Sequence, residues 1–481
     1  MSESSPPART DQSRTGAFVR IALTMLLMVV MGLTIYRIVK QYHAGGAWDV
    51  AHGGMADFHN GAYYPALAMR RGLSPYGAEF ASTYPVARAC PAYSPSIIAL
   101  HIPFTFLSLP WADIVYGVFS CMIWGCVAWL ILREYEERSR IDGPSARARR
   151  ILGSSLWLIL LLTVYASRPG HMTTLNGYFT PILVLGVQLA LQYAHRYPLL
   201  AAVGIFLASG KPNFALPLGF VMLARGNYRA LTMGVSLSLV GAILPAWWMA
   251  SHSSWSDLLD TIRQGQSQHQ ADPNEFPVNT WTRVDVMAIF AKWTNQNPSE
   301  FVQLVCMLPL LVMPCWWIRK LAVRGDREGT QTVGGCLMLL TMVLVLYHQV
   351  YDTLILLSPV AFLLFQCLSK SSWSRLFFGE PSTGVKGLAS HQGGSSAKQT
   401  MPIAREWNGL AGRSLLGSVL MVGLSMPWWN YTSTDSFLHR IEASELVHRC
   451  LTSLNGLSLM VGWMIVMMLA WRDSRPRAFQ E

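Results

Sequence analysis

The chain is poor in charged residues, and this shortage indicates its class. Charged residues make up 13% of its 481 positions, against roughly 25% in soluble domains. Apolar residues make up 52% and collect in long runs, from residues 18–38 to residues 451–471. Runs of about 17–25 apolar residues cross a bilayer as helices, because lipid leaves every backbone polar group to be satisfied inside the segment. The sequence therefore predicts an all-α polytopic membrane protein with about 11–13 transmembrane helices.

Two further absences narrow the function. The eight cysteines include no Cys-x-x-Cys pair and no Cys/His ligand pattern, so neither a structural zinc site nor a disulfide framework is indicated. The net charge of +11 forms no stripe of Lys and Arg with interleaved aromatics, as nucleic-acid binding would need. The basic residues lie beside the apolar runs, as the positive-inside rule expects. We expect membrane lipid as a partner and no nucleic acid.

The basic clusters predict which loops face the cytoplasm. The loop 319–327, the turns 195–196 and 225–229 and the C-terminal tail are basic and are predicted to be cytoplasmic. The loops poor in Lys and Arg fall on the other face, among them the turn 347–350 and the loop 430–448. The predicted order is a cytoplasmic tail 1–17, a transmembrane catalytic module 18–368 with external loops 40–94 and 251–298, a flexible cytoplasmic loop 369–413, C-terminal helices 414–471 and a cytoplasmic tail 472–481.

One segment conflicts with this order. The loop 133–150 is rich in Arg and has the composition of a cytoplasmic loop. Two apolar pieces, 95–109 and 112–132, separate it from the first external loop, and two crossings would return it to the outside. Either the shorter piece is re-entrant, or the loop 133–150 breaks the positive-inside rule.

Asp57 is the acid of greatest interest, because it opens the first external loop just after the first apolar run. A carboxylate at this place can serve as a general base at a membrane surface, although a solvated loop acid fits its position as well. Asp49 and Glu79 share the loop and are the alternative acids. No second acid pairs closely with Asp57 in the sequence, so we expect no metal and no cofactor.

Paired aromatics follow Asp57 in the same loop. Tyr63 and Tyr64 begin a stretch ending at Arg71 that has the composition of a short amphipathic helix lying in the membrane interface. An ordinary aromatic belt at headgroup depth would show the same tyrosines. The tyrosines alone therefore favour the belt.

The order of the motifs over roughly residues 45–365 resembles glycosyltransferase family 87. The first loop carries an Asp-Phe acid, paired aromatics, a Gly-x-x-Pro-Tyr turn and a Tyr-Pro element. Three later segments match in order: Leu175-Asn176-Gly177-Tyr178, Gly210-Lys211-Pro212-Asn213 and Tyr351-Asp352-Thr353-Leu354. The sequence departs from the family pattern at Tyr228, where Trp is commoner, and at Val86, where a second proline is frequent.

The resemblance implies a GT-C-like architecture and a polyprenyl-phosphate sugar as donor. It implies transfer of a hexose, by analogy mannose, with inversion to a lipid or cell-envelope glycan acceptor. It also implies a bacterial inner-membrane enzyme with an extracytoplasmic active site. Within the motifs, it points to Asn176, Tyr63 and Tyr64 as substrate-binding residues.

The chemistry requires fixed positive charge for the leaving phosphate. Lys211 lies between two short apolar stretches and is a candidate by its membrane depth, or else a snorkelling lysine in a turn. Arg283 is a second candidate, with a salt bridge to Asp285 as the alternative. His348 is a third, with a capping or interfacial role as the alternative. Asp352 is expected to cap the helix that follows it.

Two other classes stay open at this point. A transporter would carry ionisable residues near the membrane midplane in matched halves, and a flippase of lipid-linked sugar would have a cavity without a carboxylate facing the basic cluster. The sequence contains no evident internal repeat, which favours the enzyme.

Overall fold

The computed structural model describes residues 10–45, 49, 51–86, 93–139, 146–370 and 415–475. All elements in these residues are helical, apart from one isolated β-bridge between Arg283 and Gln349. In chain order they are α1 (Thr10–Tyr42), α2 (Ala56–Phe58), η1 (His59–Tyr63), α3 (Tyr64–Arg70), α4 (Ala78–Thr83), α5 (Pro95–Leu100), η2 (Ile102–Phe106), α6 (Leu109–Ser139), α7 (Ala146–Ala166), α8 (Arg168–Asn176), α9 (Thr180–Gln192), α10 (Pro198–Ala208), α11 (Pro212–Arg225), α12 (Tyr228–Ala250), α13 (Trp255–Ala271), η3 (Pro273–Glu275), α14 (Val286–Thr294), α15 (Glu300–Val323), α16 (Val333–Val345), η4 (Val350–Leu356), α17 (Leu357–Lys370), α20 (Leu415–Trp429), η5 (Tyr431–Ser433), α21 (Asp435–Arg440) and α22 (Glu445–Asp473). The predicted cytoplasmic loop 369–413 lies almost entirely outside the described residues, as do the outer parts of both predicted tails.

The helices confirm the all-α polytopic membrane class. Within the described residues, five helices are long and apolar enough to cross a bilayer: α1, α6, α12, α15 and α22. Six shorter apolar helices of 10–17 residues accompany them in the same part of the chain. The predicted number of crossings stays a prediction.

The core of the bundle is built around α16, whose every residue is buried. Next to it, α9 and α10 approach so closely that a side chain would not fit between them. A Cβ on Gly204 would lie 2.5 Å from the carbonyl oxygen of Gly186, and one on Gly186 would lie 2.7 Å from that of Gly204. Small residues that let helix backbones touch are the usual means of packing in membranes, where lipid offers no hydrophobic drive between helices.

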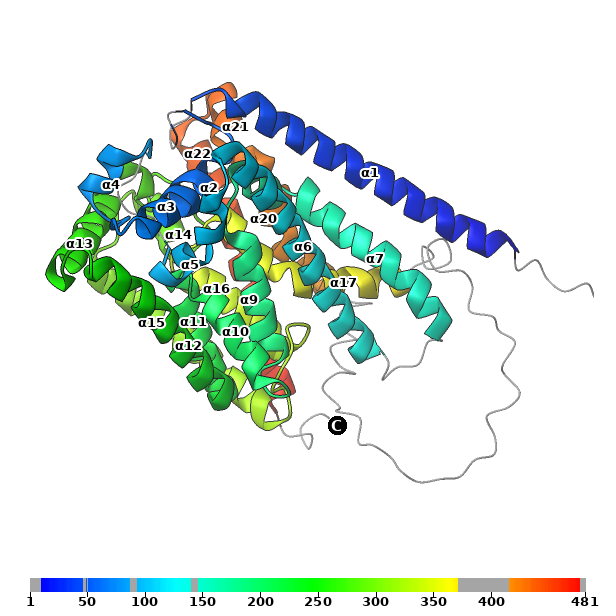
Figure 1. Ribbon diagram of the computed structural model, residues 1–481. Coiled ribbons are helices and arrows are strands. Elements are labelled where there is room, and N and C mark those ends of the chain that lie inside the picture. The colour runs from blue at the N-terminus through cyan, green and yellow to red at the C-terminus, as the bar shows by residue number, and fades with distance from the viewer. Residues whose placement is uncertain are drawn as a thin grey trace, which may run out of the picture.

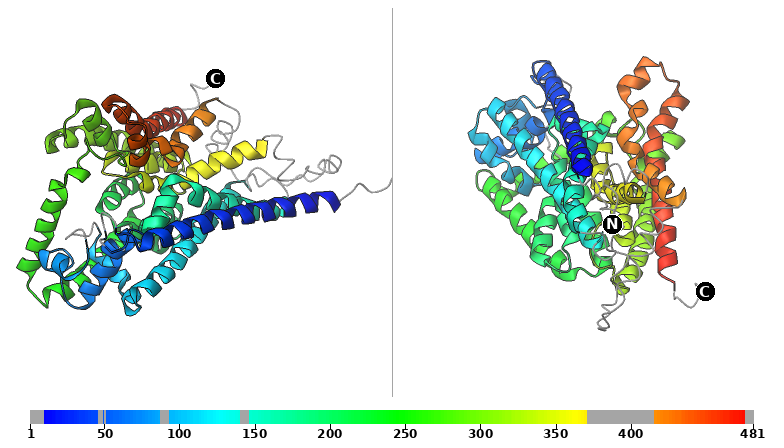
Figure 2. Two further views of the ribbon diagram at one scale, coloured as in Figure 1. Left: turned by 90° about the horizontal axis from the view of Figure 1, so that it is seen from above. Right: turned by 90° about the vertical axis from the view of Figure 1, so that its right-hand side faces the viewer.

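The periphery of the bundle is apolar and exposed, as a lipid-facing surface requires. α1 runs along the outside of the molecule beside α7 and extends past the other helices (Figures 1 and 2). Phe18 and Val29 on this helix expose more than half of their surfaces. α12 and α15 are exposed to a similar extent, since only 11% of the most apolar stretch of each helix is buried.

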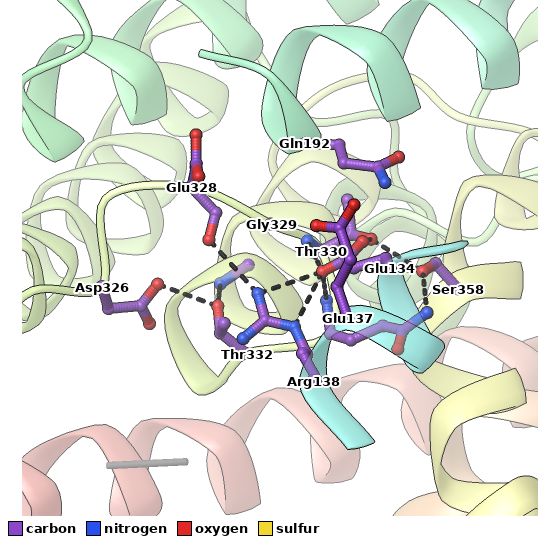
Figure 3. Close-up of polar contacts among 12 residues, drawn as sticks. Glu134, Glu137, Arg138, Gln192, Asp326, Glu328, Gly329, Thr330, Thr332 and Ser358 are labelled. Carbon is purple, nitrogen blue, oxygen red and sulfur yellow. Dashed lines mark hydrogen bonds and ion pairs between the residues drawn. The ribbon is translucent and has the colours of Figure 1, made fainter. Parts of the chain in front are cut away.

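One end of the bundle is held by a polar loop between α15 and α16 (Figure 3). The buried carboxylate of Glu134, near the end of α6, accepts hydrogen bonds from the backbone N–H groups of Thr330 (2.8 Å) and Gln331 (2.9 Å). The guanidinium of Arg225, at the end of α11, binds Asp326 in the same loop. Three segments that the sequence predicts to be cytoplasmic therefore lie together at this end with the end of α6, since the turn at Arg196 also contacts the loop.

The conflict at residues 133–150 involves the short helices before α6. The apolar piece 95–109 contains α5 and η2, of six and five residues. A six-residue α-helix is about 9 Å long, which is short against a bilayer of about 30 Å. The short helices favour the re-entrant alternative, and the end of α6 contacts the loop between α15 and α16.

The loops predicted to face the other side meet at the opposite end. The backbone N–H of Ser94 donates to the carbonyl of Gly210 at 2.9 Å, and that of Val284 donates to the carbonyl of His348 at 3.0 Å. The end of the first loop, the α10–α11 turn, the loop before α14 and the turn before η4 are thereby brought together.

Candidate active site

Asp57 lies on a short helical segment whose geometry is unusual. Met55, just before α2, has a left-handed backbone with φ of 58°, and the five residues after Phe58 form a π-helix. Both features are uncommon and are enriched at functional sites. The side chain of Asp57 is half-buried, so a bound substrate can reach it. Its Oδ2 accepts a hydrogen bond of 2.7 Å from the hydroxyl of Tyr93.

Tyr93 connects Asp57 to the turn that carries Lys211. The next residue, Ser94, bonds to the carbonyl of Gly210. A Cβ on Gly210 would lie 2.4 Å from Ile97 Cγ1 and 2.7 Å from a ring carbon of Phe179. Only glycine allows this close approach, and it holds the turn against the segment after Tyr93.

Lys211 lies in that turn with 7% of its surface exposed. Its Nζ is 3.2 Å from Oδ1 of Asp352 and 4.8 Å from the ring centre of Tyr351. A buried lysine needs such a partner because burying an unpaired charge is expensive. Of the two alternatives for Lys211, the structure contradicts the snorkelling lysine, since the ammonium points to a buried carboxylate.

His348 completes this group from the start of η4. Its side chain is fully buried, its Nδ1 lies 3.2 Å from Oδ2 of Asp352, and its Nε2 has no hydrogen-bond partner. Asp352 also accepts the backbone N–H of Gln349 at 3.1 Å. It does so from the third position inside η4, since Gln349 and not Asp352 is the cap before the helix. Among the described residues, Nε2 of His348 is a buried nitrogen without a hydrogen-bond partner.

Stacked aromatic rings join the two halves of the site. Tyr178 stacks on Tyr351 with ring centres 4.1 Å apart, and Tyr93 lies 5.4 Å from Phe179. Burial, together with the charge of Asp57, raises the pKa of Tyr93 well above its ordinary value. Its hydroxyl therefore stays protonated and remains a donor to Asp57.

Arg283 forms the salt bridge to Asp285 that was the alternative to phosphate binding. Its Nε and Nη2 each lie 2.9 Å from the carboxylate of Asp285, and its guanidinium covers the ring of Tyr347 at 4.7 Å. Bidentate pairing with Asp285 occupies one edge of the guanidinium, and Arg283 as a phosphate ligand stays a prediction. The β-bridge to Gln349 still places Arg283 beside the His348 turn.

The three predicted substrate-binding residues have different contacts and do not form one surface. They are Tyr63, Tyr64 and Asn176. The hydroxyl of Tyr63 donates to the carbonyl of Leu107 at 2.9 Å, which is a structural contact. Tyr64 is half-buried against Tyr63, with ring centres 5.5 Å apart. Asn176 ends α8 beside Leu175, whose carbonyl accepts the N–H of Met55 at 2.9 Å. Tyr63 and Tyr64 follow Asp57 on one continuous helical segment, and Asn176 is connected to that segment through the backbone hydrogen bond of its neighbour Leu175.

The alternative acids have other surroundings. Asp49 is fully buried and accepts Nδ1 of His59 at 2.7 Å, while Nε2 of His59 lies 2.9 Å from Asp113. Burial lowers the pKa of His59, but the two carboxylates outweigh it and raise the pKa above its ordinary value. Glu79 is exposed on α4. Asp49 therefore fixes the loop, and Glu79 faces away from the core.

Three members of this site were not predicted from the sequence as members. Tyr93 was not singled out, Tyr178 entered only as part of the segment Leu175-Asn176-Gly177-Tyr178, and Asp352 was expected only as a cap. Their place in the site becomes clear only from the contacts that they make in the folded chain. Tyr93 lies 36 positions from Asp57, and Asp352 lies 141 positions from Lys211. In the described part of the chain, no group of three or more His, Cys, Asp or Glu side chains is placed to hold a metal ion.

The arrangement has the parts for acid–base chemistry beside an anionic leaving group. A half-buried carboxylate is oriented by a neutral phenol, and a buried Lys–Asp–His group lies across stacked aromatic rings from it. The carboxylate can take a proton, and the cationic group can meet negative charge in a medium of low polarity.

Comparison with known proteins gives one match. The model of glycosyltransferase family 87 matches residues 92–346, just over half of the chain. The matched range contains Tyr93, Lys211 and Arg283, begins after Asp57 and ends before His348. No curated protein and no solved structure matches the chain.

Proposed function

The chain belongs to glycosyltransferase family 87, and we propose that this membrane glycosyltransferase transfers a hexose, mannose, from a polyprenyl-phosphate donor. The acceptor is a lipid or a cell-envelope glycan, and the architecture is of the GT-C type. The reaction takes place on the extracytoplasmic face of a bacterial inner membrane. The family assignment favours a transferase over the transporter or flippase alternative.

The proposed reaction is a single displacement with inversion. The acceptor hydroxyl oxygen forms a bond to the anomeric carbon as the bond from that carbon to the phosphate oxygen breaks. The hydroxyl proton passes to the carboxylate of Asp57, and the electron pair of the broken bond leaves on polyprenyl phosphate. This geometry is the one that inverting glycoside chemistry uses with a single base on the far face of the sugar.

The observation that best supports this proposal is the hydrogen bond from Tyr93 to Asp57. This bond connects the proposed base to the turn that contains Lys211, because Ser94 binds the carbonyl of Gly210. The leaving phosphate then lies toward Lys211 and His348. The Nε2 of His348 is buried and has no hydrogen-bond partner among the described residues. Because Nδ1 faces Asp352, Nε2 donates to a phosphate oxygen when the imidazole carries both protons. Lys211 would share its charge between Asp352 and the phosphate, since it already has a carboxylate partner.

The test is transfer of labelled sugar in membranes that contain the full chain. Polyprenyl-phosphate mannose and polyprenyl-phosphate glucose are compared as donors, with wild type against Asp57→Asn. General base catalysis is worth about 100- to 10,000-fold, so we expect the variant to lose at least about 100-fold in kcat with donor affinity kept. Full activity of Asp57→Asn would exclude Asp57 as the base.

Glu79→Gln is the matched control, because Glu79 is an exposed acid of the same loop. We expect it to transfer sugar at the wild-type rate. A loss in Glu79→Gln equal to that in Asp57→Asn would show that any acid of the loop matters. Transfer from the glucose donor alone would overturn the mannose assignment and leave the base in place.

A further inference from the structure

Arg168, the first residue of α8, is buried with most of its donors unused. Its exposed fraction is 2%. Its Nη1 donates to the carbonyl of Asn430 at 2.8 Å and to the hydroxyl of Ser433. Its Nε and Nη2 have no hydrogen-bond partner in the described part of the chain. These two nitrogens form one edge of the guanidinium, the edge that binds oxyanions with two parallel hydrogen bonds.

Lys292, on α14, is a second buried cation of the same kind. It is 3% exposed, and its Nζ makes a single long contact of 3.4 Å, to the carbonyl of Thr452. Burial lowers the pKa of Lys292 to about 8, with a smaller opposing effect of Asp285, and the charge of Arg168 is among those that lower it. The two cations therefore lie within Coulombic range of each other.

The same polar segments hold both cations. Asn455 of α22 accepts the side-chain N–H of Asn430 at 2.8 Å and donates to Ser433 at 3.2 Å. The hydroxyl of Ser453, the residue after the Lys292 partner, is also buried and without a hydrogen-bond partner. The ring of Trp281 lies against the guanidinium of Arg168, whose central carbon is 4.9 Å from the ring centre.

The charges in this cluster do not balance. Among the described residues, neither Arg168 nor Lys292 makes an ion pair with a carboxylate. Asp285, the nearest acid to act on Lys292, is already bound on both oxygens by Arg283. Buried cations are normally paired, because removing a charge from water costs several kcal/mol. Two buried cations without a carboxylate partner, held by the same polar segments and with donors unused, have the composition of an anion site.

We propose that Arg168, Lys292 and Ser453 form a binding site for the phosphate group of a phosphate-bearing ligand. The guanidinium edge supplies two donors to one face of the phosphate, and the ammonium and the hydroxyl supply donors to its other oxygens. A carboxylate has only two oxygens and would leave donors unused. The site differs from the Lys211–Asp352–His348 group, whose cation has its own carboxylate.

The site lies beside the proposed active site, because Trp281 and Arg283 are two residues apart. If the proposed function holds, the ligand is a lipid phosphate of the donor or the acceptor, held while the sugar is transferred. This assignment rests on the proposed function, whereas the binding of phosphate itself does not.

The experiment measures binding without turnover, on the full-length protein in phosphatidylcholine nanodiscs. Inorganic phosphate, chloride and acetate are compared at one ionic strength by thermal unfolding, and polyprenyl phosphate or phosphatidylglycerol is then added to the discs. We expect phosphate to raise the unfolding temperature, and Arg168→Gln and Lys292→Met each to weaken this effect about tenfold or more in phosphate affinity. The lipid that competes with inorganic phosphate identifies the source of the phosphate.

Two further results decide the matter if a variant folds poorly. Without phosphate, Lys292→Met should unfold at or above the wild-type temperature, since it removes an unpaired buried charge. Arg263→Gln, an exposed arginine on α13, should respond to phosphate as wild type does. Equal stabilisation by chloride or acetate would mean that phosphate binds as an adventitious ion only, and it would overturn the proposal. An unchanged phosphate response in both site variants would overturn it as well.

Failure of this site and failure of the proposed function are separable. If phosphate binding is lost in the site variants while no sugar is transferred by wild type, the anion site stands and the function falls. If Asp57-dependent transfer is seen with wild-type KM in Arg168→Gln and no phosphate response, the function stands and this site falls.

Discussion

The hydroxyl of Tyr93 donates a hydrogen bond of 2.7 Å to Oδ2 of Asp57. The two residues lie 36 positions apart, in segments that share no helix. The bond orients the carboxylate and stabilises its charged form. Tyr93 is thus a positioning residue for the proposed base.

Tyr93→Phe removes this donor and keeps the ring. Because the charged form of Asp57 loses a hydrogen bond, we expect the acid limb of kcat against pH to move up by about one to two pH units. The measurement is a pH profile of sugar transfer in membranes. Tyr84→Phe is the matched control, since its hydroxyl bonds to Arg71, and its acid limb should not move. An unmoved limb in Tyr93→Phe would contradict the positioning role.

Lys211 and Asp352 form a buried ion pair whose partners depend on each other. Removing one partner leaves an unpaired buried charge, so Lys211→Met and Asp352→Asn should each lower the free energy of unfolding by about 3–5 kcal/mol. The double variant should lose clearly less than the sum, because no charge is then left alone. Unfolding temperatures in nanodiscs measure this. Additive losses would show that Lys211 is not held by Asp352.

His59 is held between Asp49 and Asp113, and its raised pKa predicts a pH dependence of stability. Its stabilising contribution is complete below the unfolded value of about 6.5 and is lost as pH rises through the folded pKa. Burial raises the pKa of Asp49, but its hydrogen bonds from His59, Ala51 and His52 outweigh this and lower it. The contribution of Asp49 is therefore lost on the acid side, as pH falls below about 3.9 toward its folded pKa.

We expect the unfolding temperature of wild type to fall on the alkaline side of neutrality. His59→Gln should flatten this decline and lower stability by about 3 kcal/mol or more, because two buried carboxylates lose their shared cation. The measurement is thermal unfolding across the neutral range. His439→Gln, whose histidine also pairs with an aspartate but is 83% exposed, should keep the wild-type slope. A parallel decline in both variants would contradict the role of His59.

Local sequence patterns were sufficient to predict part of the fold of this molecule. The apolar runs predicted the helical membrane class, and the basic clusters predicted which loops share an end of the bundle. The hydrogen bond of Asp352 to the start of its helix also followed from its place before an apolar run. These features depend on a residue and its near neighbours, or on the sum of a loop's charge.

The pairing of charges could not be predicted in the same way. Arg283 and Asp285 are two residues apart, and the sequence left their salt bridge open as an alternative. Lys211 and Asp352 are 141 residues apart, and no local signal joins them. Arg168 was passed over because it follows an apolar run like any flanking arginine.

Periodicity, composition and motif order can be read along the chain, and they were sufficient to predict the membrane class, the family resemblance and Asp57 as the acid to test. Which cations are neutralised within the chain depends on packing and became clear from the three-dimensional structure. A residue's type does not say how far it lies from a counter-charge, and packing brings Asp352 to Lys211 but no carboxylate to Arg168 among the described residues. The balance of buried charge is a property of the fold, because Coulombic energy depends on distance in space.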